Sequence, residues 1–284
     1  MSTLLTICQN VAVRAGYQSP SAIIGVSSDL QRQLLAFANE VVQRAANKYE
    51  WPKLIKEYTF TLSTSVPSYA LPGDTNRIIT ETAWDRGTAW PLTGPLSAQE
   101  WQQFKSGTTQ ASIPRRFRVK GMEDEEFFID PTPASADNGL TMAFEYVSDR
   151  PIRPKTWVAS TAFAAGSYCF YDGRYYYTGA GGTTSTTAPT HTTGTAADGT
   201  VTWAFFSGAY NTFLADTDLP NIDSLAIEQG LYERVCRMKG SQYEPMFDSD
   251  LDRAYIKQRP ARPISLRASG QGPSQFQTRI LTPP

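Results

Sequence analysis

The residue types that most often perform catalysis are sparse in this sequence of 284 residues. Its single histidine, His191, stands in a threonine-rich stretch with no cysteine or carboxylate at ligand spacing. A histidine-based metal site, a Ser-His-Asp triad or a Cys-His dyad would each have to be built on that residue. The three cysteines, Cys8, Cys169 and Cys236, lie far apart and form no CxxC pair. We therefore predict no catalytic, cofactor-binding or metal-binding residues, and no enzymatic activity.

Two further patterns resemble ligand sites but have simpler interpretations. The run 179–184 lacks the lysine followed by serine or threonine that a phosphate-binding loop requires, so it predicts a loop between strands. Asp216 and Asp218 are close enough in sequence to suggest a divalent cation site, but helix capping explains them with fewer assumptions.

A cluster of aromatic residues between positions 168 and 177 has two interpretations. Alternating members can form the core of a small β-module, which we favour because aromatic side chains bury a large apolar area. Alternatively, they form a platform on which sugar rings stack. In that case Tyr175, Tyr176 and Tyr177 would face the glycan.

Composition and charge exclude several classes of protein. Lys plus Arg total 26 and Asp plus Glu total 27, which gives a net charge of −1 and a pI near 5.9. A generally basic nucleic-acid-binding domain is thereby excluded. The 40% hydrophobic and 19% charged residues exclude a disordered chain. No window approaches the roughly 18 apolar residues of a membrane helix, and we expect neither a membrane anchor nor a secretory leader.

Helical periodicity marks both ends of the sequence. Apolar residues predict one helix over 4–15 and a second over 28–49, with Ser28 and Gln31 forming a capping box. A third helix is predicted to begin at Asp218 or Leu219, just before Pro220, and a fourth begins at Pro245.

The middle of the sequence changes to the period of two that is typical of strands. Residues 58–62, 117–120, 127–130 and 140–147 predict strands of an antiparallel β-domain. Residues 97–104 predict a short helix in which Ser97 and Glu100 form a capping box.

Residues 155–210 differ in composition from the rest, being rich in Gly, Thr, Ala and Tyr. Their two Asp-Gly turns, flanked by aromatic alternation, predict a small antiparallel β-module. We interpret this module as an insertion with few contacts to its host. The predicted fold is therefore α+β, with a helical core and a β-domain (residues 1–154 and 211–258), the inserted module (155–210) and an extended carboxy-terminal arm (259–284).

The arm carries positive charge and no carboxylate side chain. Its arginines and the apolar residues suited to burial are Arg259, Arg262, Arg267 and Arg279, with Ile264, Leu266, Phe276, Ile280 and Leu281. Those five apolar side chains are too few to fold alone, although each yields ~1.5–3 kcal/mol when buried in a preformed groove. We predict that the arm is stable only on a partner.

Several stretches occur in an order typical of one family. They are Tyr49-Glu50-Trp51-Pro52, Glu57–Leu62, Tyr69–Asp74, Phe144–Ser148 and Phe213–Pro220. In this order the chain resembles the head-to-tail adaptor, or connector, proteins of short-tailed bacteriophages. Each motif is short, so their order over most of the chain carries the resemblance. The 155–210 segment resembles a small module found in many phage structural proteins.

That resemblance implies a structural protein of the virion, at the head-tail junction, made in the cytoplasm of the bacterial host. It implies a ring of twelve copies around the DNA channel, with roles in genome packaging and DNA ejection. The ring would bind the portal protein through the arm, hold the tail nozzle or tail-tube protein, and let DNA pass without sequence-specific contact. The alternative is a carbohydrate-binding or decoration protein acting through the 155–210 module. A cell-wall hydrolase would need paired carboxylates in a cleft.

Overall fold

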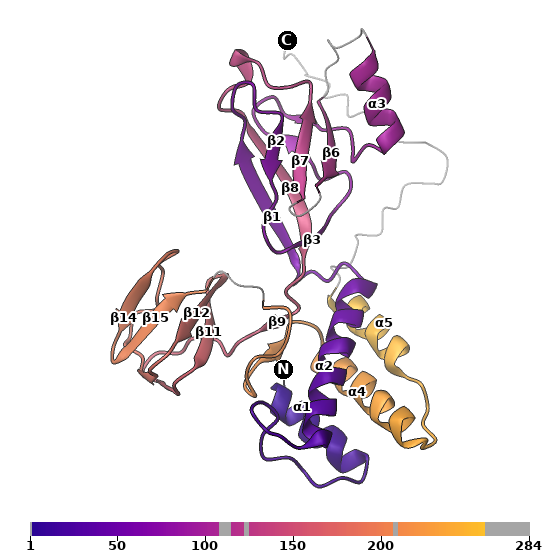
Figure 1. The fold of residues 1–284 in the computed structure, drawn as a ribbon, viewed down its shortest axis with the longest axis vertical. Helices are drawn as coiled ribbons and strands as arrows, with labels where there is room; N and C mark the ends of the chain where they lie inside the picture. The colour runs from indigo at the N-terminus through magenta and orange to yellow at the C-terminus, as the bar shows by residue number, and fades with distance from the viewer. Residues whose placement is uncertain (1, 108–114, 122–124, 207–209, 259–284) are drawn as a thin grey trace, which may run out of the picture.

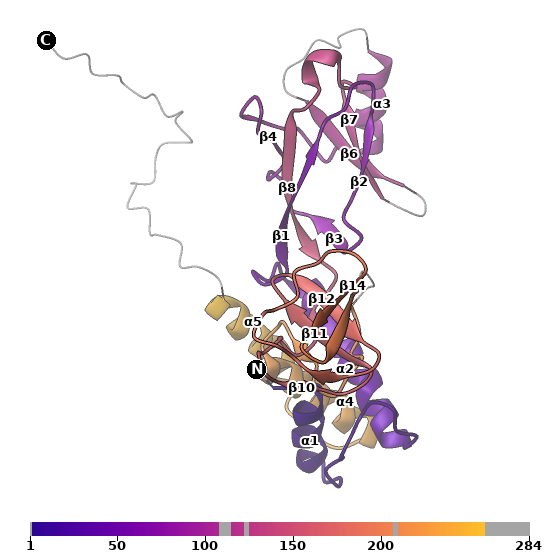
Figure 2. The ribbon, with the colours of Figure 1, turned by 90° about the vertical axis from the view of Figure 1, so that its left-hand side faces the viewer.

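The computed structural model describes residues 2–107, 115–121, 125–206 and 210–258. It is elongated, with a helical base at one end of the long axis and a β-domain at the other (Figure 1). A small β-module lies beside the base, and Figure 2 shows it in front of the base when the molecule is turned by 90°. The predicted α+β class, a helical core with antiparallel sheets, is confirmed.

Four of the five helices in the described residues form the base, and α3 belongs to the β-domain. Their bounds are α1 (Leu4–Arg14), α2 (Asp29–Lys48), α3 (Ala98–Ser106), α4 (Ser224–Lys239) and α5 (Phe247–Gln258). Helix α4 packs against α1, α2 and α5, so the amino-terminal and carboxy-terminal helices form one bundle. Its Ile227 and Leu231, and Leu34 of α2, are fully buried between the helices. The helices of the base thus share one hydrophobic core, as the predicted helical core requires.

The predicted capping of two helices differs from the structure. Ser28 is the N-cap residue of α2, as predicted, but it makes no side-chain capping bond, and Gln31 donates to the backbone oxygen of Ala22 instead of completing a capping box. Helix α4 begins at Ser224, where the carboxylate of Asp223 accepts from the backbone N–H of Leu225 at 2.9 Å.

Asp218 and Pro220 therefore do not start a helix. Pro220 lies in a short strand pair with Ile152. The Asp218 carboxylate accepts from the backbone N–H groups of Leu214 and Ala215, both at 2.8 Å, and so closes the preceding loop. Asp-rich turns and helix caps use the same side chain-to-backbone bond, which is why the sequence pattern fits both.

The described strands fall into five sheets. Their bounds are β1 (Ile55–Thr61), β2 (Ser68–Ala70), β3 (Thr75–Ile78), β4 (Trp84–Asp85), β5 (Trp90–Pro91), β6 (Arg116–Lys120), β7 (Glu126–Asp130), β8 (Thr141–Ser148), β9 (Ile152–Arg153), β10 (Ala162–Phe163), β11 (Ser167–Tyr171), β12 (Arg174–Thr178), β13 (Gly182–Thr183), β14 (Thr195–Asp198), β15 (Val201–Phe205) and β16 (Leu219–Pro220).

The β-domain is a sandwich of two antiparallel sheets. Strand β8 is the centre of the first: it pairs with β1 along its whole length and with β3 and β4 on its other edge. The second sheet has the order β2-β7-β6. Between the sheets, Phe127 stacks on Phe117 at 4.5 Å and on Phe144 at 5.2 Å. This stack of aromatic rings is the core of the sandwich, since all three side chains are buried.

The β-module has two apolar faces. On one face of its sheet, Cys169, Tyr176 and Trp203 form a core of the module's own. On the other face, Tyr175 and Tyr168 pack against the helical base. Residues 155–210 therefore contribute aromatic side chains to the core of the helical base. A sheet with aromatic residues at alternate positions on both faces has to bury both.

The strongest link between module and base is Tyr210. Its side chain is 0% exposed, its ring stacks on Tyr175 at 5.4 Å, and its hydroxyl donates to Oδ1 of Asp218 at 2.7 Å. Burial raises the pKa of Asp218, so the ionised carboxylate depends on the few donors around it.

A glycine in α4 allows the base helices to approach closely, and this gives a first prediction. A methyl group at Gly230 would lie 2.6 Å from Cδ2 of Phe247 and 2.8 Å from Cγ1 of Val41. Alanine favours a helix over glycine by about 1 kcal/mol, but overpacking costs about 1–3 kcal/mol. We expect Gly230→Ala to lower the free energy of unfolding, measured by urea denaturation. Gln229→Ala is the control, and a Gly230→Ala protein more stable than wild type would contradict the packing.

A second prediction concerns the hydroxyl of Tyr210. Tyr210→Phe removes a donor to a buried carboxylate, and we expect a loss of roughly 1.5–3 kcal/mol in the free energy of unfolding at neutral pH. Because the pKa of Asp218 is raised in the folded state, the neutral form predominates at low pH and needs this donor less. The loss should therefore grow as pH rises through that pKa. A loss that is constant between acidic and neutral pH would contradict this role.

Candidate functional site

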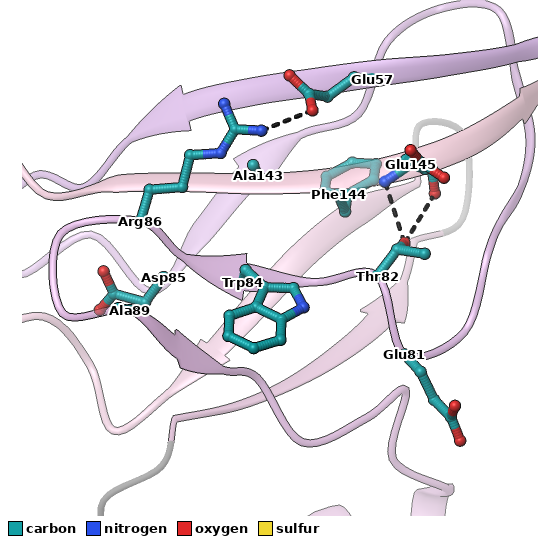
Figure 3. Close-up of a pocket in the computed structure, with 10 residues that line it drawn as sticks. All are labelled: Glu57, Glu81, Thr82, Trp84, Asp85, Arg86, Ala89, Ala143, Phe144 and Glu145. Carbon is teal, nitrogen blue, oxygen red and sulfur yellow. Dashed lines mark hydrogen bonds and ion pairs between the residues drawn. The ribbon is translucent and has the colours of Figure 1, made fainter. Parts of the chain in front are cut away.

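A groove of about 670 Å³ runs over the outer face of the first sheet of the β-domain (Figure 3). It is lined by Glu57, Glu81, Thr82, Trp84, Asp85, Arg86, Ala89, Ala143, Phe144 and Glu145. We call this set the acidic groove. Its side chains come from β1, β4, β8 and the segments that flank β4.

The acidic groove exists because β8 is left uncovered at one residue. Its burial pattern is almost continuous, and Glu145 is its one exposed position. There the chain between β3 and β4 bends away, and the Thr82 hydroxyl fills the gap. Its Oγ1 accepts from the Glu145 N–H at 3.1 Å and donates to the Ile79 carbonyl at 2.7 Å. The side chain of Glu145 is thereby directed to the outside while its backbone stays bonded.

A tight turn sets the second wall of the groove. The buried Asp85 carboxylate accepts from the backbone N–H groups of Gly87 and Thr88 at 2.9 and 3.1 Å. This turn pairs β4 with β5 and holds two tryptophans on the surface, because Trp84 is 44% and Trp90 is 52% exposed. Trp84 is opposite Pro91 and Trp90 is opposite Asp85, so the two indoles lie on opposite faces of the ribbon, and Trp84 is the one that lines the groove.

The charge of the groove is unbalanced. Glu57 and Glu145 are directly opposite in the β1–β8 register, a like-charge arrangement that destabilises a sheet. Among the residues that the structure describes, Arg86 pairs with Glu57 at 2.6 Å and Arg115 pairs with Asp85 at 3.4 Å. Glu81 and Glu145 add two further carboxylates at the rim. The groove is therefore suited to a cationic partner.

Two of the five non-glycine residues with positive φ in the described chain line the groove. Glu81 and Ala89 both have left-handed backbone conformations, with φ of 68° and 58°. This conformation costs a residue other than glycine roughly 1–2 kcal/mol. Strain of this kind clusters at functional sites.

A smaller pocket of about 290 Å³ lies where the β-domain, base and module meet, and it is lined by Lys53, Lys56, Arg150 and Arg153 among others. Lys56 is bound to the buried Asp74 at 2.6 Å. Burial raises the pKa of Asp74, but hydrogen bonds from Lys56, Ser148 and Tyr146 outweigh it and hold that pKa below its usual range. These charges fix the junction between the parts.

The structure separates the three tyrosines predicted to face a glycan. Tyr175 and Tyr176 are 5% and 0% exposed, so neither offers a ring face to a ligand: the glycan-facing alternative is wrong for both, and the favoured interpretation as buried aromatic residues agrees with the structure. Adjacent residues of a strand point to opposite faces of the sheet. The helical base covers Tyr175 on one face, and the module's own core covers Tyr176 on the other. Tyr177 is half-buried against Tyr168, at 4.9 Å between ring centroids.

Other predicted positions have structural roles or lie elsewhere. Asp216 accepts from the backbone N–H groups of Ile23 and Ile24 and joins two distant segments. The nine arm residues between Arg259 and Leu281 lie outside the described residues. Within the described ranges, no group of three or more metal-ligating residues is placed to hold an ion, and no helix has the length and apolar character to cross a bilayer.

The sequence analysis did not identify the acidic groove. The sequence Asp85-Arg86-Gly87 predicts a turn. The exposure of Trp84 and Trp90 depends on strand pairing, which the sequence pattern does not give. A pair of tryptophans flanking such a turn was the available signal.

The exposed tryptophans should matter little for folding. We expect Trp84→Ala to lower the free energy of unfolding by about 1–2 kcal/mol, because nearly half of its side chain is already in water. Trp51→Ala, at a fully buried position of the base, should cost about 3–5 kcal/mol. Equal losses in urea denaturation would show that Trp84 is a core residue and would contradict its assignment to a binding surface.

Comparison with known proteins identifies the family. No curated protein matches this chain. Residues 2–168 match the family described as SU10 adaptor protein, a range that spans α1, α2 and the whole β-domain and runs into the 155–210 segment. This match covers more than half of the sequence and agrees with the order of segments that resembles phage head-to-tail adaptors. The chain belongs to the SU10 adaptor protein family and has the structural role of a phage adaptor.

Proposed function

We propose that copies of this chain form a ring at the head-tail junction, around the DNA channel, which binds the portal protein and provides the attachment site for the tail nozzle or tube. The family match over α1, α2 and the β-domain carries this proposal. The elongated shape supports it, because the base and the β-domain present different surfaces at opposite ends (Figure 1). An adaptor between two partners needs two such surfaces.

The carboxy-terminal arm is our candidate for the portal contact. Arg259, Arg262, Arg267 and Arg279 supply positive charge, and Ile264 and Leu266 supply part of its apolar surface. Burial of the apolar side chains in a portal groove would offset the entropy lost when the arm becomes ordered. Complementary charge would increase the rate of encounter.

DNA would pass such a ring without sequence-specific contact. The chain has a net charge of −1, so the ring as a whole would not hold the DNA phosphates tightly. Twelve copies, as the resemblance to connectors implies, would surround the channel. The 155–210 segment is retained in this proposal as a module at the side of the base, fixed there by Tyr175 and Tyr210.

Removal of the arm tests the proposed portal contact. We expect a chain truncated after Gln258 to keep its helical circular dichroism but to bind purified portal at least about tenfold more weakly, a loss of ~1.4 kcal/mol or more. A matched full-length variant with Gln at Arg259, Arg262, Arg267 and Arg279 should bind more slowly and show less salt dependence. Portal binding and ring formation by the truncated chain at wild-type affinity would contradict the proposal.

A further inference from the structure

The acidic groove has chemical requirements for its partner. Glu81 and Glu145 offer carboxylates to a cation, and the exposed face of Trp84 offers an apolar surface to a flat group. Arginine meets both needs, since its guanidinium pairs with carboxylates and stacks on indole rings. A suitable partner is thus an arginine-bearing segment with apolar side chains and no acidic ones.

The carboxy-terminal arm of the chain itself has this chemistry. Residues 259–284 carry four arginines, five large apolar residues and no Asp or Glu. These 26 residues could span up to roughly 90 Å when extended. The helix that precedes them, α5, ends at Gln258 and lies on the side of the molecule from which β4 projects (Figure 2). The arm therefore starts on the same side as the groove.

We propose that, before assembly, residues 259–284 bind the acidic groove of their own chain, which then supplies the surface that the arm was predicted to find only on a partner. Tethering gives the arm a millimolar effective concentration at a site within its reach, so weak contacts suffice to hold it. The inference rests on the proposed function in one respect: at assembly the portal competes for the same arm and releases it from the groove. The docked arm thus slows portal binding, because the portal must first displace the arm from the groove.

Disulfide trapping in the full-length chain tests this docking. Ala89→Cys places a thiol in the groove, and Ser265→Cys places one in the arm between Ile264 and Leu266. The native cysteines are buried, and burial raises the pKa of Cys8 and Cys169 to about 12, so the engineered pair reacts first. We expect an intramolecular disulfide to form at least about tenfold faster than in a control with Ser19→Cys and Ser265→Cys, because docking raises the local thiol concentration.

Charge reversal supplies the matched variant. In the chain with Ala89→Cys and Ser265→Cys, adding Glu81→Lys and Glu145→Lys should slow disulfide formation about tenfold. When Glu81 and Glu145 are kept, added salt should also slow disulfide formation. Glu50→Lys with Glu244→Lys, which adds the same charge outside the groove, should leave the rate unchanged. Equal rates in all variants, or disulfide-linked dimers in place of the intramolecular product, would overturn the inference.

Portal binding separates this inference from the proposed function. The Glu81→Lys, Glu145→Lys chain should bind portal at least as fast as wild type, since its arm is already free. If trapping fails while wild-type chain forms rings on the portal, only the docking is wrong. If trapping succeeds and no ring forms on the portal, only the proposed function is wrong.

Discussion

The pairing of strand β8 is the constraint on which the rest of the structure depends. This one strand pairs with β1, β3 and β4, contributes Phe144 to the aromatic stack of the sandwich, and buries Val147 in the core of the helical base. A shift of register by one residue would turn Phe144 and Tyr146 outward and bring Glu145 into the core. The position of Glu145 in the acidic groove is thus a direct consequence of packing on the other face.

The three parts are held as one body by contacts between residues far apart in sequence. Asp74 binds Lys56, Tyr146 and Ser148 at the foot of the β-domain, and Tyr210 binds Asp218 between module and base. Each contact is a buried carboxylate with a small number of donors. Removing a donor from such a group costs more than an exposed ion pair contributes.

The sequence predicted most elements and some of their ends, but few of their partners. Apolar spacing located the helix pair at residues 4–49 and the strand at 140–147, and Ser97 with Glu100 forms the predicted capping box. Periodicity could not predict that β8 pairs with three strands, because pairing is decided by distant residues. It favoured burial of the tyrosines at 175 and 176, as the structure shows, but it did not predict that two different cores bury them. The acidic groove depends on the strand pairing, which is why periodicity did not predict it.

Locating this chain in the virion tests the adaptor role most directly. An image of the neck at low resolution, with the chain marked by a label fused to its amino terminus, would show where the copies lie. We expect the label in a single ring between portal and tail, surrounding the DNA channel. Label on the capsid surface or along the tail fibres would contradict a role as head-to-tail adaptor.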